Sequence, residues 1–286
     1  MLRTEIKKFV LESGVLLFKV LLGVIRVFQR MASPTTASHL QNIFLFFCGS
    51  PVRHGYDKKK KLYIAKQQGL IRYYGEKDRG FRFYAPSIVA RGELLSNSYC
   101  LESVIFEKDD VVVDCGANYG DLYIHLADKV AEKNYIAIEP SPIEYKCLIN
   151  SLPNARILNL GLSDQDGVLD FYVCSNLGDS SIVEPPNYTN VVKVKVRRMD
   201  SVASSLNIEK CKLFKLEAEG WELEILQGAR EFIRICKYIA VDGGPERGVD
   251  AQPTFHALNN FLLKHGFEMI SINGPDYRAL YRNLSL

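Results

Sequence analysis

The feature that most constrains this chain is an apolar run that ends in a carboxylate and a glycine-containing loop. The β-branched residues Val111–Val113 favour a fully buried strand. Asp114 follows at the strand end, and Gly116 and Gly120 allow a tight turn and a close approach of backbone to a ligand. Residues 121–130 have helical spacing, so the sequence predicts the strand, loop and helix of a nucleotide-binding crossover.

The next strand supplies a second carboxylate to the same edge. Tyr135–Ile138 is apolar and ends in Glu139, near the separation of about 20 residues from the loop that is expected for a carboxylate binding a ribose. A dinucleotide fingerprint would need glycine at Asn118 and Asp121, and the Asp114 carboxylate would repel a pyrophosphate. S-adenosylmethionine presents an ammonium, a sulfonium and a ribose, so the residues favour this cofactor. The alternative is a glycine turn without a ligand.

Strands and helices alternate along the rest of the chain. Further strands are expected at Arg156–Leu160, Leu213–Leu216 and Tyr238–Val241, with an antiparallel pair at Leu169–Cys174 and 192–196 and a closing hairpin at Phe267–Ile272 and Tyr277–Tyr281. This order predicts an α/β fold with a doubly wound, mostly parallel sheet and an antiparallel C-terminal hairpin. Ligands bind such sheets beyond the carboxyl ends of the strands, where five acidic residues are expected: Asp114, Glu139, Asp164, Glu217 and Asp242.

An ordered series of motifs resembles the FkbM family of S-adenosylmethionine-dependent methyltransferases. The motifs are Val113–Gly120, Glu139–Pro142, Leu162–Asp164 and Lys215–Ala229. The resemblance covers roughly residues 101–286 and implies a class I methyltransferase fold. It also implies O-methylation of a hydroxyl on a glycan, a glycolipid or a secondary metabolite, so the expected partner is a small-molecule or saccharide acceptor.

The same resemblance implies roles for individual residues. The residues expected to line the methionine end of the cofactor are Asp114, Gly116, Asn118 and Gly120. Glu139 is expected to hold the ribose, and Asp164 to lie near the adenine amino group, although Asp164 also suits a turn. The family pattern Lys-x-Asp-x-Glu-Gly is altered here, because Glu217 stands in place of the aspartate. Its carboxylate reaches one methylene further.

Methyl transfer requires an aligned hydroxyl and a group that accepts its proton. Glu217 and Glu219 are the candidate bases at the end of the fourth main strand, with Lys215 and Asp242 behind them. Glu219 could instead stabilise the first turn of the following helix, and Lys215 could only neutralise the acids. The competing function is a methyltransferase-fold binding or scaffold protein without catalysis.

Composition excludes several other classes of protein. A net charge of +3 and the absence of a basic, aromatic-rich array argue against nucleic-acid binding. Seven scattered cysteines without a CxxC pair predict a reducing, cytoplasmic compartment and no disulfide framework. The five histidines do not cluster with cysteines at metal-ligand spacing, so no metal site is expected.

The N-terminal segment is apolar except for one stripe of charges. At helical spacing the stripe contains Lys8, Glu12, Lys19, Arg26 and Arg30. Charges interrupt the run of about 20 apolar residues that a membrane span requires. The segment is expected either to lie in a membrane surface, which would place the protein peripherally at the membrane, or to pack on the protein or a partner subunit in an oligomer.

The chain is therefore expected to have three parts: an amphipathic helix in residues 1–31, a linker and mixed lead-in region in 32–100, and a methyltransferase domain in 101–286. Residues 32–38 have the composition of a linker. The lead-in region is expected to contain short strands at Leu62–Ala65, Leu70–Tyr74 and Phe81–Tyr84 and a helix over Ile88–Phe106. The run Lys58–Lys61 is expected to form a solvated loop.

Overall fold

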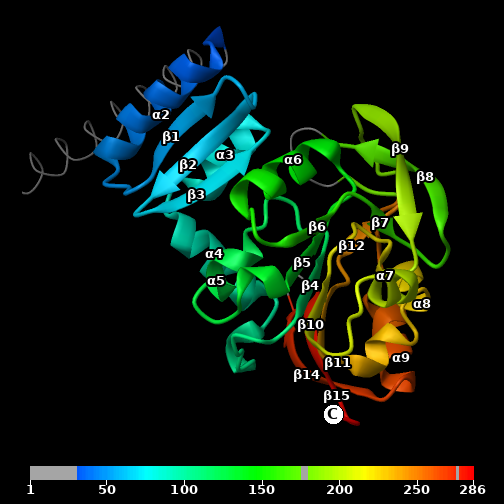
Figure 1. The fold of residues 1–286 in the computed structure, drawn as a ribbon. Helices are drawn as coiled ribbons and strands as arrows, with labels where there is room; N and C mark the ends of the chain where they lie inside the picture. Colours follow the sequence, from blue (N-terminus) through cyan, green and yellow to red (C-terminus); the bar gives the residue numbers. More distant parts are fainter. Residues whose placement is uncertain (1–30, 175–179, 275–276) are drawn as a thin grey trace, which may run out of the picture.

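The computed structural model describes residues 31–174, 180–274 and 277–286, and a seven-stranded sheet forms its centre (Figure 1). In spatial order the strands are β14 (Phe267–Asn273), β15 (Arg278–Asn283), β11 (Cys236–Asp242), β10 (Cys211–Leu216), β4 (Val112–Cys115), β5 (Tyr135–Ile138) and β6 (Arg156–Leu158). The strands from β11 to β6 are parallel, and β15 runs antiparallel to both of its neighbours. The doubly wound sheet with its antiparallel hairpin is confirmed.

Helices cover both faces of this sheet. Alternate residues of β4 point to opposite faces, so Val112 and Val113 belong to different apolar clusters. One face packs against α7 (Met199–Ser205), α8 (Glu222–Gln227) and α9 (Phe255–Lys264). The other packs against α4 (Ile88–Ser98), α5 (Leu122–Leu126) and α6 (Pro142–Ser151). Burial on both faces explains why the central strands are continuous apolar runs.

Two smaller sheets stand beside the central one. β7 (Gly161–Leu162), β9 (Asn190–Arg197) and β8 (Gly167–Val173) form a three-stranded sheet in that order. The predicted antiparallel pair is its β8–β9 part, which is confirmed. β12 (Pro245–Arg247) pairs with β13 (Gln252–Pro253) just after β11. The chain also makes short 3₁₀ turns at η1 (Leu101–Ser103), η2 (Glu132–Asn134) and η3 (Phe232–Ile235).

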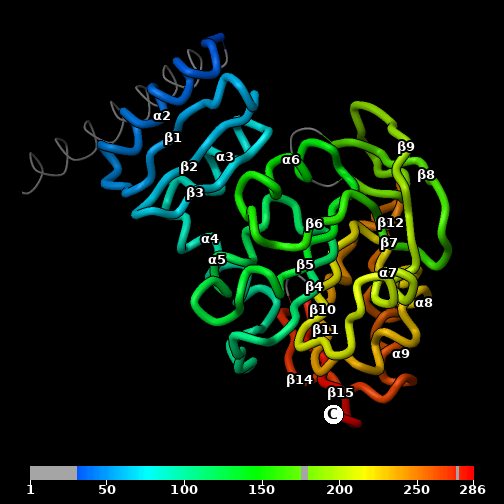
Figure 2. The backbone as a smooth tube through the Cα atoms, in the orientation of Figure 1, coloured from blue at the N-terminus to red at the C-terminus, as the bar shows by residue number. Residues whose placement is uncertain are grey.

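The lead-in region folds into a compact unit on one side of the sheet (Figure 2). It consists of α2 (Pro34–Phe47), the antiparallel sheet β1 (Arg53–Asp57), β2 (Leu62–Gln67) and β3 (Leu70–Tyr74), and α3 (Lys77–Tyr84). Lys58–Lys61 form the turn between β1 and β2, as expected for a solvated loop. β1 has no counterpart in the sequence prediction.

Two predictions for this region were wrong. Residues 32–38 are not a linker, because Ser33 caps α2 by accepting a hydrogen bond from the Thr36 backbone N–H, and Pro34 occupies the first turn. Phe81–Tyr84 is not a strand but the end of α3, whose buried residues are Arg79, Gly80, Phe81 and Tyr84. The alternating Phe-Arg-Phe-Tyr pattern is too short to separate the two periods. Two expected helices are also shorter than predicted. The helix expected over Ile88–Phe106 ends at Ser98, and, in the methyltransferase domain, the helix expected over 121–130 is α5, Leu122–Leu126.

The amphipathic helix predicted for residues 1–31 lies outside the described residues except for Met31. Its charged stripe, with Lys8, Lys19, Arg26 and Arg30, is therefore not described. Within the described ranges, no helix is long and apolar enough to cross a membrane. All seven cysteines fall within those ranges, and each is free of disulfide bonding.

Candidate functional site

A cavity of about 280 Å³ opens beyond the carboxyl ends of the central parallel strands. Seven of the sequence-predicted site residues line it together: Asp114, Gly116, Asn118, Glu139, Lys215, Glu217 and Glu219. Gly120 and Asp164 are not part of the lining. The strand-end argument from sequence therefore brought most of the proposed residues to one place.

The glycine loop is shaped by left-handed backbone. Gly116 has φ +72°, and a Cβ there would lie 1.9 Å from the carbonyl oxygen of Glu217. Gly120 has φ +80°, and a Cβ there would meet Leu148 and Leu152 of the α6 region at 2.8–2.9 Å. Gly116 therefore lets the loop approach the neighbouring strand end, whereas Gly120 lets it pack against a helix.

Asn118 and Glu139 join the first two strand ends. Asn118 also has a left-handed backbone, with φ +51°. Its N–H donates to Glu139 Oε2 at 2.9 Å, and the N–H of Ser141 donates to Glu139 Oε1, also at 2.9 Å. Burial, with a smaller effect from Glu144, raises the pKa of Glu139 to about 7 despite these two donors. Glu139 is thus a fixed hydrogen-bond acceptor whose charge depends on pH near neutrality.

Asp114 is buried beneath the loop and already has two side-chain partners. The Tyr135 hydroxyl donates to Asp114 Oδ2, and Lys215 Nζ lies 3.0 Å from Asp114 Oδ1. Burial raises the pKa of Asp114, and Lys215 and Tyr135 offset part of this effect. The cation that faces Asp114 here is Lys215, a pairing that the strand-end argument did not predict.

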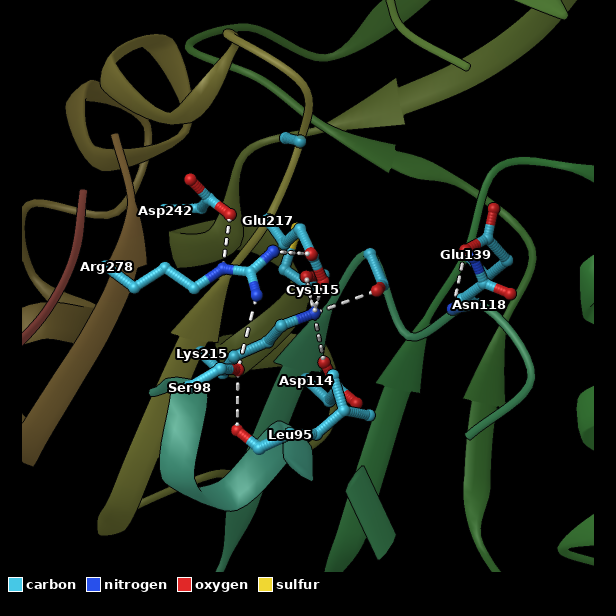
Figure 3. Close-up of polar contacts among 12 residues, drawn as sticks. Leu95, Ser98, Asp114, Cys115, Asn118, Glu139, Lys215, Glu217, Asp242 and Arg278 are labelled. Carbon is cyan, nitrogen blue, oxygen red and sulfur yellow. Dashed lines mark hydrogen bonds and ion pairs between the residues drawn. The ribbon is translucent and has the colours of Figure 1, made fainter. Parts of the chain in front are cut away.

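A buried ion network extends from Lys215 across the strand ends (Figure 3). Lys215 Nζ lies 2.8 Å from Glu217 Oε2, and Arg278 Nη2 lies 3.0 Å from Glu217 Oε1. Arg278 Nε then donates to Asp242 Oδ2 at 2.6 Å, and Arg278 Nη1 donates to Ser98 Oγ at 3.2 Å. Together with the pair between Lys215 and Asp114, these contacts link β4, β10, β11, β15 and α4 at one end of the sheet.

These contacts fix the charges of the network. Burial alone would raise the pKa of Glu217, but Lys215 and Arg278 outweigh it and lower the pKa to about 2. Burial likewise lowers the pKa of Lys215, but Asp114 and Glu217 outweigh it and hold the pKa above its ordinary value. Glu217 is consequently a stable anion with little basicity at neutral pH.

Glu219 does not lie in the first turn of the following helix, which begins at Glu222. Glu219 has φ +52°, and its carbonyl accepts a hydrogen bond from Ser181 Oγ at 2.9 Å. Instead, the buried Glu222 accepts from the N–H groups of Ala218 and Gly220 at 2.7 and 3.2 Å. The carboxylate that accepts backbone N–H groups just before α8 is therefore that of Glu222.

Asp164 is exposed and accepts a hydrogen bond from Ser163 Oγ at 3.0 Å. The proposed contact of Asp164 with adenine stays a prediction.

The lead-in region contributes residues to the cavity that sequence reasoning missed. They are Arg79, Phe83, Arg91, Leu95 and Tyr99. The Arg79 guanidinium donates to Asn118 Oδ1, lies 3.4 Å from Glu144 and sits 4.4 Å from the Tyr119 ring centre. Arg91 pairs with Asp121 at 3.1 Å. The sequence around Arg79 and Arg91 gave no local signal of these contacts, because their partners Asn118, Asp121 and Glu144 lie far along the chain.

The groups on the loop suit a cationic, phosphate-free cofactor. Asp114 and Glu139 line the cavity beside Gly116, where no side chain fits. A pyrophosphate at the loop would meet the Asp114 carboxylate, whereas Glu139 suits the ribose of either ligand, so the acceptor groups present fit S-adenosylmethionine better than a dinucleotide.

Comparisons with known proteins agree with this chemistry. The methyltransferase FkbM domain model matches residues 114–269, more than half of the chain. The chain is 23% identical to the 2-O-methyltransferase NoeI of Sinorhizobium fredii over 80% of this chain and 97% of that protein. It is 27% identical to the hexuronic acid methyltransferase AglP of Haloferax volcanii over 55% of this chain and 64% of that protein.

A solved structure of a methyltransferase FkbM from Methylobacillus flagellatus is similar, with a TM-score of 0.45 and 19% identity. The match covers 71% of this chain and about half, 52%, of that one. The FkbM match begins at Asp114 and falls inside the range 101–286 expected for the catalytic domain, whose boundaries stay a prediction. The chain belongs to the FkbM family and is a methyltransferase that depends on S-adenosylmethionine.

Proposed function

We propose that this protein transfers a methyl group to a hydroxyl of a saccharide, either free or part of a glycan or glycolipid. One observation carries the proposal: the glycine loop with Glu139 opens into the same cavity as Glu217, Glu219 and Lys215. A cofactor bound at the loop and an acceptor at the acidic end would share one enclosed space. Relatives named for 2-O-methylation and for a hexuronic acid support the acceptor class.

We assign the cofactor end to Asp114, Gly116, Asn118 and Glu139, which line the cavity. The family pattern also implies Gly120, which packs against the α6 region, and Asp164, which lies outside the lining. When bound, S-adenosylmethionine supplies a methyl group that is activated by the attached sulfonium. Glu139 would accept hydrogen bonds from ribose hydroxyls, and Gly116 would let the backbone approach the ligand. Asp114 would act together with Lys215, because the two charges form one buried pair.

The chain's main contribution to rate is alignment of the acceptor. Ion pairs join Lys215, Glu217 and Arg278 at the acceptor end, so hydroxyl groups of a sugar would meet charges held in place by one another. Positioning of this kind supplies much of the acceleration in a bimolecular displacement.

The test is transfer of a labelled methyl group. The full chain is incubated with methyl-labelled S-adenosylmethionine and a cell-envelope glycan extract from cells that lack this protein, and the products are analysed by mass spectrometry. Label on a sugar oxygen is the expected result. Cofactor binding without any transfer to the extract would contradict the proposed function and would favour a binding or scaffold protein.

We also propose peripheral attachment to a membrane through the N-terminal segment. Directly after that segment, α2 exposes Ile43, Phe46 and Phe47 at the i, i+3 and i+4 spacing of one helix face. Apolar burial would add to attraction between the basic stripe and anionic headgroups.

Vesicle flotation tests the attachment. The full chain should float with anionic vesicles, whereas a chain beginning at Met31, which keeps the Ser33 cap of α2, should not. If the full chain forms a dimer that does not bind vesicles, and the truncated chain is a monomer, the N-terminal segment is an oligomerisation element and the membrane proposal is wrong.

A further inference from the structure

The group that takes the acceptor's proton is the open question at this site. The base predicted from sequence, Glu217, has one oxygen on Lys215 and the other on Arg278. To accept a proton it would have to give up at least one of two ion pairs, and its partner Lys215 is buried. Its geometry suits an anchor better than a base.

Another carboxylate of the same cavity lacks such partners. Glu246 lies on the short strand β12, beyond the carboxyl end of β11, and lines the cavity with its side chain half-buried. Within the described part of the chain, its carboxylate has neither a hydrogen bond nor an ion pair. Most other acids of the lining are engaged by side chains or backbone N–H groups; these are Asp114, Asp121, Glu139, Glu144 and Glu217.

The neighbouring cations are already committed elsewhere. Arg247 follows Glu246 directly, yet its guanidinium lies on Glu224 at 2.6 and 3.0 Å and on the carbonyl of Gly220 at 2.6 Å. Arg278 binds Asp242 and Glu217. The carboxylate of Glu246 is therefore left open toward the cavity.

We propose that Glu246 is the catalytic residue that accepts the proton of the acceptor hydroxyl, and that Glu217 is a positioning residue. This inference rests on the proposed methyl transfer to a hydroxyl. The acceptor oxygen forms a bond to the methyl carbon while the carbon–sulfur bond breaks, and that electron pair remains on sulfur as the thioether. The hydroxyl proton passes to the Glu246 carboxylate and then to solvent.

Burial and the neighbouring acids give Glu246 a higher pKa than Glu217, so Glu246 is the stronger base. Burial raises the pKa of Glu246 to about 8, reinforced by Asp242 on β11, Glu222 on α8 and Glu217 after β10, and opposed by Arg278 on β15. At pH 7 about a tenth of Glu246 would be ionised, so the rate should rise as the pH passes through about 8.

The experiment compares three variants in the labelled-methyl assay with the glycan extract, from pH 6 to 9. Glu246→Gln removes the base and keeps the volume, Glu217→Gln removes the anchor, and Asp250→Asn removes an exposed charge four residues further along the chain, outside the cavity lining. Affinity for S-adenosylhomocysteine is measured for each by calorimetry, and folding by urea denaturation.

Glu246→Gln should lose about 10²-fold or more in rate and the rise near pH 8, with S-adenosylhomocysteine affinity unchanged. Glu217→Gln should keep the rise at a lower rate, and Asp250→Asn should match the wild type. A Glu246→Gln enzyme with the wild-type rate and pH profile, or loss of the rise in Glu217→Gln alone, would overturn the inference but leave the proposed function intact. A wild-type protein that transfers no label would overturn both.

Discussion

The two ends of the cavity are built in different ways. At the cofactor end, Glu139 is held by backbone N–H groups of Asn118 and Ser141, which come from consecutive strand–helix connections. At the acceptor end, Lys215, Glu217 and Arg278 are held by one another's charges. Arg278 reaches Glu217 from the last strand of the chain.

The two ends differ in how strongly the loss of one charge affects the neighbouring side chains. A carboxylate bound by neutral backbone donors can gain or lose its own charge with limited effect on its neighbours. A buried ion network cannot lose one member cheaply, because the remaining charges stay buried without compensation. The acceptor end should therefore be rigid and sensitive to charge, and the cofactor end should respond to pH and to loop geometry.

Replacement of Lys215 should produce the largest effect. Lys215→Met keeps an unbranched side chain of similar size but leaves Asp114 and Glu217 without their shared cation. It should lower the free energy of unfolding by about 3–5 kcal/mol. Urea denaturation measures the loss. Lys210→Met is the matched control, because its pair with Asp109 is exposed, and its unfolding midpoint should not move. Equal midpoints for the two variants would show that the buried position of the Lys215 charge does not matter for stability, and would contradict the charge sensitivity of the acceptor end.

Gly116 connects the two ends and should give the next largest effect. Gly116→Ala places a Cβ against the Glu217 carbonyl in left-handed backbone, and should cost about 2–4 kcal/mol of unfolding free energy together with cofactor binding. Gly49→Ala has a similar φ of +69° with nothing within 4 Å, so it should cost only about 1–2 kcal/mol. A Gly116 variant no worse than the Gly49 variant would contradict the close approach.

The same contrast explains how far the sequence could be interpreted. The loop, the strand ends and the sheet follow from local patterns, because buried parallel strands are apolar and their carboxyl ends meet at one edge. The partners of Asp114 and Glu217 could not be predicted, since hydrogen bonds and ion pairs between distant strands leave no periodic signal.

Similar reasons account for the errors in the lead-in region. Residues 32–38 contain Ser, Thr and Pro, which suit a linker, but Ser33 and Pro34 are also the residues that begin a helix. Arg79 and Arg91 could not be placed at the cavity without knowing that this region packs beside the loop. Glu219 lies outside the first turn because α8 starts later than the apolar spacing suggested.

At the cofactor end, ionisation of Glu139 should make ligand affinity depend on pH. Because the pKa of Glu139 is raised to about 7, the carboxylate ionises as pH rises through 7 and becomes a stronger acceptor for ribose hydroxyls. Calorimetry should show S-adenosylhomocysteine binding about tenfold tighter at pH 8 than at pH 6. Glu139→Gln should remove most of this difference, and a variant that keeps it would exclude Glu139 as its source.

Stability without ligand should move in the opposite direction. The pKa of Glu139 is higher in the folded chain than its ordinary 4.5, so the unfolded state loses this proton first. The contribution of Glu139 to the free energy of unfolding should therefore fall as pH rises from about 4.5 to about 7. Glu139→Gln should flatten that part of the wild-type curve in urea denaturation, and an unchanged slope would contradict the assignment.

The smallest expected effect tests whether the lead-in region supports the cofactor end. Arg79 on α3 holds Asn118 Oδ1, and the Asn118 N–H in turn holds Glu139. Arg79→Met keeps an unbranched apolar side chain on α3 but removes the guanidinium that lies over the Tyr119 ring and donates to Asn118, so the left-handed Asn118 loses one of its restraints. S-adenosylhomocysteine should bind about three- to tenfold more weakly, which corresponds to roughly one hydrogen bond. Arg82→Met removes the same charge from an exposed position of the same helix, and its affinity should equal that of the wild type. If both variants bind equally, the contact between Arg79 and Asn118 does not contribute to cofactor binding, and the lead-in region only forms a wall of the cavity.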